Sequence, residues 1–104
     1  HVDTERLVRF CTKEQIGLVV IGPEDPLAAG LADLLRAKGF KVFGPSKEAA
    51  RVEGSKVFAK ELMRHADVPT ADFQIFDHPS PARTYIETRD YPVVVKADGL
   101  AAGK

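Results

Sequence analysis

Two short aliphatic runs on either side of a helical stretch place the strongest constraint on the fold of this chain. Residues 18–21 read LVVI, and residues 40–43 read FKVF just before Gly44-Pro45. Gly39, a natural helix terminator, precedes the second run. A strand, a helix and a strand within about 26 residues predict a compact β-α-β unit with parallel strands and a right-handed crossover. The helix between them carries its leucines at helical spacing, at positions 27, 31, 34 and 35.

The run at residues 18–21 is continuously aliphatic, without alternation. Such a run is typical of a strand that is covered on both faces, as in a parallel sheet. A helix is expected before it, capped by Asp3 or Thr4 and ended by Gly17. Its apolar face would hold Leu7, Phe10 and Cys11. Cys11 is interpreted as a buried packing residue rather than a nucleophile, because no histidine lies near it in the sequence.

The chain changes character after residue 44, and a boundary between structural units is expected between residues 44 and 54. Ser46 opens a short helical turn, and a clear helix starts at Gly54-Ser55 and ends near residues 68–70. Further along, the pattern predicts a strand at residues 73–76, a helix from Ser80-Pro81 to about Arg89 that buries Ala82, Tyr85 and Ile86, and a strand at residues 92–95.

Composition narrows the classes of function. Lysine plus arginine equals aspartate plus glutamate at 15 each, which argues against nucleic acid as the main partner. One cysteine excludes an internal disulfide and a zinc site built on several cysteines, and a reducing, cytoplasmic compartment is the simplest inference. No apolar run approaches the roughly 20 residues that span a bilayer. The three histidines, His1, His65 and His78, are isolated and show no metal-ligand spacing.

The first candidate site is the turn Gly22-Pro23-Glu24-Asp25, which follows the first predicted strand. Ligands of open α/β sheets bind at the carboxyl ends of the strands. A carboxylate held there between prolines could accept hydrogen bonds from sugar hydroxyls. The alternative is a plain turn whose acidic residues favour the positive end of the next helix. The five residues from 22 to 26 leave both interpretations open.

The second candidate site is the segment KADGLAAGK at residues 96–104. Lys96 leaves a predicted strand, and the following small residues would let backbone N–H groups approach an anion closely. The spacing is not that of the P-loop, because Gly99 and Gly103 are four residues apart rather than five. Lys56, near a predicted helix start, supplies a second cation. Two lysines and a small-residue loop indicate phosphate binding more strongly than either feature alone, although a plain turn remains the alternative.

Four stretches together closely resemble the glycinamide ribonucleotide synthetase family of the ATP-grasp superfamily. They are GPEDPL at 22–27, FGPSKEAARVEGSK at 43–56, VPTADF at 68–73 and VVVKADGLAAGK at 93–104, and they occur in order over essentially the whole chain. The run KADGLAAGK is highly specific to this family. The resemblance implies an α/β fold in which residues 1–46 are the C-terminal part of a Rossmann-like pre-ATP-grasp domain and residues 47–104 are a linker and the start of an ATP-grasp domain.

The resemblance also implies an activity. It is the ATP-dependent ligation of glycine to 5-phosphoribosylamine in de novo purine synthesis, through glycyl phosphate, with Mg²⁺ or Mn²⁺ held by residues outside this chain. The implied ATP-binding residues are Lys56, Lys96, Asp98, Gly99, Leu100, Ala101, Ala102, Gly103 and Lys104, the last seven forming part of a mobile lid. Glu24 would bind the ribose of phosphoribosylamine, with Gly22, Pro23 and Asp25 shaping the turn. No residue is assigned as catalytic or as a metal ligand.

Two other interpretations stay open at this stage. The chain could belong to another ATP-grasp ligase or carboxylase, or to a non-enzymatic α/β module that binds a nucleotide. In addition, the absence of an initiator methionine and the end inside a glycine-rich loop predict that the chain is an internal fragment of a longer enzyme. Because the resemblance implies metal ligands outside this chain, the chain alone is expected to be inactive.

Overall fold

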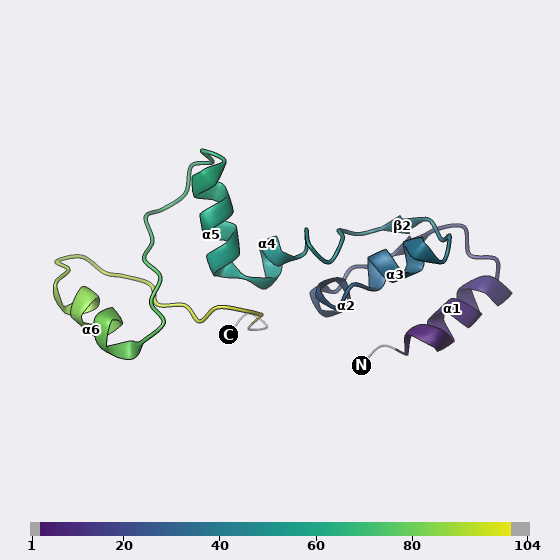
Figure 1. Cartoon of the computed structure of the whole chain (residues 1–104), viewed down its shortest axis with the longest axis horizontal. Helices are drawn as coiled ribbons and strands as arrows, with labels where there is room; N and C mark the ends of the chain where they lie inside the picture. The colour runs from purple at the N-terminus through teal and green to yellow at the C-terminus, as the bar shows by residue number, and fades with distance from the viewer. Residues whose placement is uncertain (1–2, 101–104) are drawn as a thin grey trace. The chain divides into compact units, whose positions relative to one another are not determined.

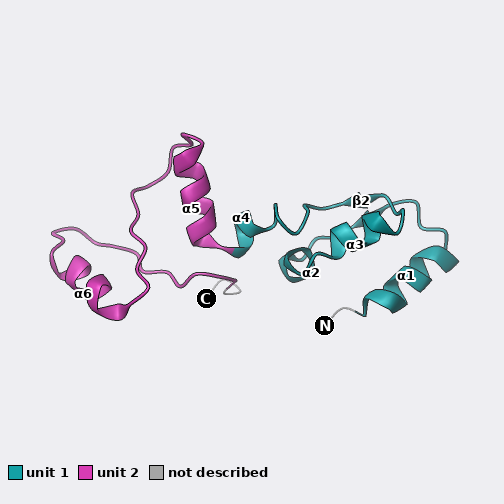
Figure 2. Ribbon diagram, viewed as in Figure 1, with its two compact units in different colours: residues 1–54 teal, residues 55–104 magenta. Residues whose placement is uncertain are grey.

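The computed structural model describes residues 3–100. The chain divides into two compact units, residues 1–54 and residues 55–104 (Figure 2). Helices and a small parallel sheet make it an α/β structure, and each unit is described by itself (Figure 1). The division at residues 54 and 55 is a property of the packing, and the domain boundary expected after residue 46 stays a prediction.

Helix α1, Thr4–Lys13, opens the first unit. Asp3 caps it, because its carboxylate accepts a hydrogen bond from the Arg6 N–H at 3.0 Å. Cys11 is buried, as expected. Leu7 and the neighbouring Val8 pack against the core of the unit. Phe10, which was expected on the buried face, is instead more than half exposed, so that part of the prediction is wrong.

The sheet of this unit has two parallel strands, β1 (Val19–Val20) and β2 (Val42–Phe43). Val19 is paired with Val42 and Val20 with Phe43, which confirms the predicted parallel β-α-β arrangement. The strands are covered on one face only, contrary to the expectation of two covered faces: Val20 and Phe43 are 64% and 69% exposed. An aliphatic run shows that a strand can be buried on both faces, but the rest of the tertiary structure decides which faces are covered.

The single helix expected between the strands is two helices, α2 (Glu24–Ala29) and α3 (Leu31–Ala37). Gly30 separates them in the left-handed region with φ of 92°. A Cβ at this position would lie 3.3 Å from the Lys47 side chain, so both the conformation and the space favour glycine. Periodicity alone did not show the break, because the apolar spacing continues through it.

The core of the first unit lies between the sheet and these helices. Leu35 of α3 is fully buried, whereas its neighbour Leu34, expected on the same apolar stripe, is 40% exposed. Partly buried apolar residues from α1 and the strands surround the core. The buried cluster comprises Ile21, Leu27, Ala32, Leu35 and Ala50.

Polar contacts from α3 fix the segment that follows β2. The Arg36 guanidinium donates to the carbonyl of Gly44, and the Asp33 carboxylate accepts from the Lys47 N–H at 2.8 Å. Ser46 then accepts from the Ala49 N–H at 3.1 Å and opens the predicted helical turn, which leads into α4 (Arg51–Gly54). These contacts place the loop after β2 against α3.

The second unit contains helices α5 (Lys56–His65) and α6 (Pro79–Glu87). Ser55 caps α5 through a 3.1 Å hydrogen bond from the Phe58 N–H. Helix α6 starts one residue before the predicted Ser80, and Ile86 is 40% exposed rather than buried. The Phe76 and Tyr85 rings lie 5.3 Å apart and attach α6 to the segment before it.

The strands predicted at residues 73–76 and 92–95 do not form in the part of the chain that the structure describes. Phe73 is half-buried between the Lys60 and Arg64 side chains, with the two cations 5.6 and 5.4 Å from the ring centroid. Val94 and Val95 are largely exposed. A strand requires a hydrogen-bonded partner, and among residues 3–100 neither segment has one.

Candidate functional site

The first candidate site lies at the carboxyl edge of the sheet in the first unit. Ile21 donates from its N–H to the Phe43 carbonyl at 3.0 Å, so the two strands end side by side. Gly22 and Gly44 therefore leave the same edge of the sheet. This is the position where open α/β sheets bind ligands.

Glu24 and Asp25 form the first turn of α2, and both are exposed. Their carboxylates stand at the positive end of this short helix, as the simpler of the two sequence interpretations requires. Pro23 occupies the cap position and provides no side-chain cap. The structure thus places Gly22, Pro23, Glu24 and Asp25 together at the sheet edge, and their role toward a ribose stays a prediction.

The second unit brings together residues from two of the recognised stretches, at the N-terminus of α5. The Asp98 carboxylate accepts from the Ser55 hydroxyl at 3.1 and 3.2 Å, and from the Val57 N–H at 3.2 Å. Next to it, the Lys56 ammonium donates to the Gly99 carbonyl at 2.6 Å. We call these five residues, Ser55, Lys56, Val57, Asp98 and Gly99, the Asp98 cluster.

Hydrogen bonding makes the Asp98 carboxylate more acidic. The Val57 N–H is the main cause that lowers its pKa from the ordinary value of 3.8, and partial desolvation opposes it. The N–H of Gly99, the Ser55 hydroxyl and the N–H of Lys56 lower the pKa further. Each donor stabilises the charged form, so Asp98 is an anion at neutral pH.

The other residues of the predicted phosphate-binding segment are less engaged. Lys96 and Leu100 are exposed, and no hydrogen bond joins the Lys96 side chain to any of residues 3–100. The structure thus joins Lys56, Asp98 and Gly99, and leaves the Lys96 ammonium accessible. Four residues predicted to belong to the segment, Ala101, Ala102, Gly103 and Lys104, lie outside the described residues.

Sequence reasoning missed Ser55 and Val57 as members of this site. Ser55 was recognised only as the start of a helix. Its position before an apolar periodic stretch was the available signal, because such a serine is favoured as a helix cap. Nothing in the sequence links Ser55 to a carboxylate 43 residues away.

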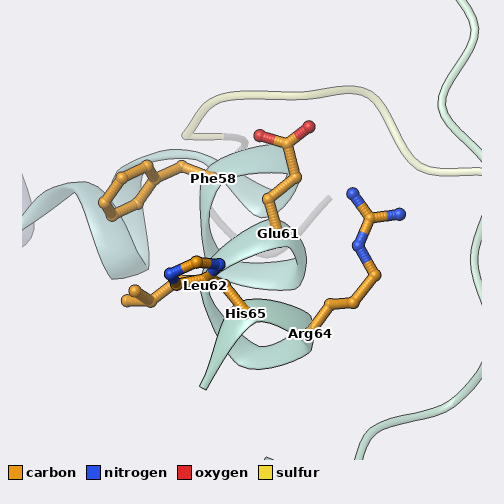
Figure 3. A pocket seen from close by; sticks show the side chains of 5 residues that line it. All are labelled: Phe58, Glu61, Leu62, Arg64 and His65. Carbon is orange, nitrogen blue, oxygen red and sulfur yellow. The ribbon is translucent and has the colours of Figure 1, made fainter. Parts of the chain in front are cut away.

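A separate depression of 580 Å³ lies along α5. Figure 3 shows its lining side chains projecting from this one helix. They are Phe58, Glu61, Leu62, Arg64 and His65. None of them is a predicted site residue, and a hollow formed by one helix face provides no converging groups.

Two further findings concern the described residues as a whole. Between residues 3 and 100, no group of three or more histidine, cysteine, aspartate or glutamate side chains could hold a metal ion. Over the same residues, every helix is too short or too polar to cross a bilayer.

Comparison with known families accounts for the whole chain. Residues 1–53 match the family model described as phosphoribosylglycinamide synthetase, N domain. Residues 54–104 match the model described as phosphoribosylglycinamide synthetase, ATP-grasp (A) domain. The chain therefore belongs to the class of ATP-grasp synthetases. It contains residues of the N domain and the start of the ATP-grasp domain.

Individual relatives give the same result. The chain is 50% identical over 102 residues to a protein of Pasteurella multocida and 51% identical over 102 residues to one of Mesorhizobium japonicum, each match covering 98% of this chain. A protein of Neisseria meningitidis is 51% identical over 98 residues, or 94% of this chain. All three are named phosphoribosylamine–glycine ligase.

The chain belongs to the phosphoribosylglycinamide synthetase family. It spans about a quarter of the length of the curated relatives that it matches, 24% for the Pasteurella and Mesorhizobium proteins and 23% for the Neisseria protein. The resemblance stated from the sequence is thus confirmed at the level of the family.

Proposed function

We propose that the complete protein containing this chain is an ATP-dependent ligase that joins glycine to 5-phosphoribosylamine in purine biosynthesis. Residues 1–46 would be part of a Rossmann-like domain, and residues 47–104 would be a linker and the start of the ATP-grasp domain. The observation that carries the proposal is the meeting of Lys56 with Asp98 and Gly99 at the N-terminus of α5. These residues come from two separate stretches that match the ligase family, and the named relatives share this activity by name.

The proposed reaction has two steps. A carboxylate oxygen of glycine attacks the γ-phosphorus of ATP, the bond to the β-phosphate oxygen breaks, and ADP leaves. The amine nitrogen of phosphoribosylamine then attacks the acyl carbon of glycyl phosphate, inorganic phosphate leaves, and the nitrogen loses a proton. Both steps develop negative charge on phosphoryl oxygens, which positioned cations stabilise.

Lys96 and Lys56 supply such cations in this chain. Lys96 is exposed and would contact the ATP phosphates directly. Lys56 is half-buried, and its ammonium is held on the Gly99 carbonyl, which belongs to the proposed segment 98–104. That segment would close over the triphosphate and keep water from glycyl phosphate.

The sheet edge of the first unit is proposed to bind phosphoribosylamine. Glu24 would accept hydrogen bonds from the ribose hydroxyls, and Gly22, Pro23 and Asp25 would shape its turn. The exposure of Glu24 at the carboxyl edge of the parallel strands supports this assignment.

ATP-grasp chemistry uses a divalent metal ion, proposed here as Mg²⁺ or Mn²⁺. Residues 3–100 do not fit such an ion, since they contain no suitable group of ligands. We therefore assign no metal ligand within them and derive no step through the metal. For the same reason we expect the 104-residue chain alone to show no glycine-dependent ATP turnover.

The test measures phosphate release by the product of the complete reading frame, with ATP and phosphoribosylamine, in the presence and absence of glycine. We expect release that depends on both substrates, and a fall of about tenfold or more in kcat/KM for Lys96→Ala, from loss of a charge-assisted contact. Lys38→Ala, an exposed lysine of the first unit, is the matched control. Phosphate release that does not require glycine would indicate another ATP-grasp ligase, and ATP binding without release would indicate a binding module.

A further inference from the structure

We propose that Asp98 is a positioning residue, which holds the start of the phosphate-binding segment on the N-terminus of α5 and does not itself contact the nucleotide. The inference rests on the proposed function only for the identity of the ligand. The contacts that carry it lie wholly within the second unit.

The first step concerns the partners of the N–H groups at the start of α5. The first N–H groups of a helix have no partner within the helix. The Ser55 hydroxyl accepts from the Phe58 N–H at 3.1 Å, and the Asp98 carboxylate accepts from the Val57 N–H at 3.2 Å. Asp98 therefore completes the cap of α5 from 41 residues away in the sequence.

The second step concerns the link between the two capping side chains. A serine hydroxyl can accept one hydrogen bond and donate another. Ser55 accepts from Phe58 and donates to Asp98, so both functions of its hydroxyl are used. The position of Asp98 thus depends on Ser55 as well as on the helix.

The third step concerns the residue that follows. The Lys56 ammonium donates to the Gly99 carbonyl at 2.6 Å, so two consecutive residues, Asp98 and Gly99, are attached to the first two residues of α5, Val57 and Lys56. Gly99 has a φ of 91°, a conformation that other residues rarely adopt. The chain is thus both fixed and turned at Asp98 and Gly99, near the beginning of the predicted phosphate-binding segment 96–104.

The fourth step explains why Asp98 is not a ligand for ATP. Its two oxygens accept hydrogen bonds from donors of the protein, and its negative charge occupies the end of α5 that would otherwise attract a phosphate. A phosphate placed there would meet a like charge at close range. The nucleotide phosphates would accordingly meet the lysines, with Asp98 setting where the segment starts.

The test on the 104-residue chain follows the amide hydrogen exchange of Val57 and Phe58 by NMR. Asp98→Ala should raise the exchange rate of the Val57 amide several-fold relative to that of Phe58, whereas Ser55→Ala should raise both. Ser55→Thr, which keeps the hydroxyl, should restore protection. The matched control is Asp90→Ala, an exposed acidic residue of the same unit. Unchanged Val57 exchange in Asp98→Ala would overturn the proposal.

A double-mutant cycle in the complete protein separates positioning from direct contact. If Asp98 acts through Ser55, the rise in KM for ATP in the double variant Ser55→Ala with Asp98→Ala should be no larger than the larger single effect. If the rise in KM of the double variant instead equals the product of the two single rises, and Ser55→Thr does not restore the KM for ATP, Asp98 contacts the nucleotide directly. That result would overturn the proposal. A wild-type protein that does not turn over ATP would refute the proposed function, while the Val57 measurement would still decide the role of Asp98.

Discussion

Truncation of Leu35, whose side chain is fully buried, tests the packing of the first unit. Leu35 has no exposed surface, and Leu34, its neighbour on the same helix, is 40% exposed. Leucine to alanine removes three carbon atoms, worth about 2.4 kcal/mol when fully buried, and the cavity left behind adds to this cost. We expect Leu35→Ala to lower the free energy of unfolding by about 2.5 to 4 kcal/mol and Leu34→Ala by about 1 kcal/mol.

The two variants form a matched pair, because the change in helix propensity is the same in both. A unit of about 54 residues is stable by roughly 3 to 8 kcal/mol, so Leu35→Ala should remove a large part of its stability. Urea titration followed by far-ultraviolet circular dichroism, with exchange of the Val19 and Ile21 amides of the sheet, measures the loss. Equal costs for the two variants, or a cost below about 1 kcal/mol for Leu35→Ala, would refute the packing argument.

Three further predictions follow from single contacts. Gly30→Ala should cost about 1 to 2 kcal/mol by urea titration, because its φ is 92°, whereas Gly17→Ala, which has open space and no positive φ, should cost less. Asp3→Ala should destabilise α1 by about 1 kcal/mol through loss of its cap, measured as a fall in helical circular dichroism on heating; no change would contradict the capping role. The pKa of Asp98 is lowered from 3.8, so its attachment to α5 should be complete above about that pH and lost as the pH falls through the lower folded value. The Val57 amide shift should follow this titration and become insensitive to it in Asp98→Asn.

The pH prediction depends on the sign of the shift. A carboxyl whose pKa is lower in the folded state stabilises that state when ionised, so acid removes the contribution and base does not. The charged group beside Asp98 on α5 is the Lys56 ammonium, which donates to the Gly99 carbonyl rather than to the Asp98 carboxylate. Loss of the attachment on raising the pH from neutrality to 8 would contradict the assignment to Asp98.

Local patterns predicted the helices and the parallel strand pair well. Asp3 and Ser55 were recognisable as caps, because a cap is satisfied by residues only a few positions away. The break at Gly30 was not recognised, because its cause is a left-handed backbone packed against Lys47, which is distant along the chain. Exposure of Phe10 and Ile86 was likewise missed, because spacing identifies an apolar face without showing what packs against it.

The candidate site divides in the same way. The sequence identified Lys56, Asp98 and Gly99 as members of two motifs. The match of residues 54–104 to the ATP-grasp (A) domain model confirms the family to which these motifs were assigned. It did not show that Asp98 caps α5 or that Lys56 holds the Gly99 carbonyl. Those contacts join residues more than 40 positions apart, and no local propensity encodes such a pairing.

The sequence by itself therefore determined the family and the β-α-β unit, and it named the residues that we propose bind phosphate. Each of these depends on local spacing or on a motif that can be read along the chain. Only the tertiary structure decided which face of the sheet is covered and that residues 92–95 form no strand among residues 3–100. It also decided that the Asp98 carboxylate is hydrogen-bonded to the N-terminus of α5. The physical reason is that burial, strand pairing and hydrogen bonds between distant residues exist only once the segments are brought together in space.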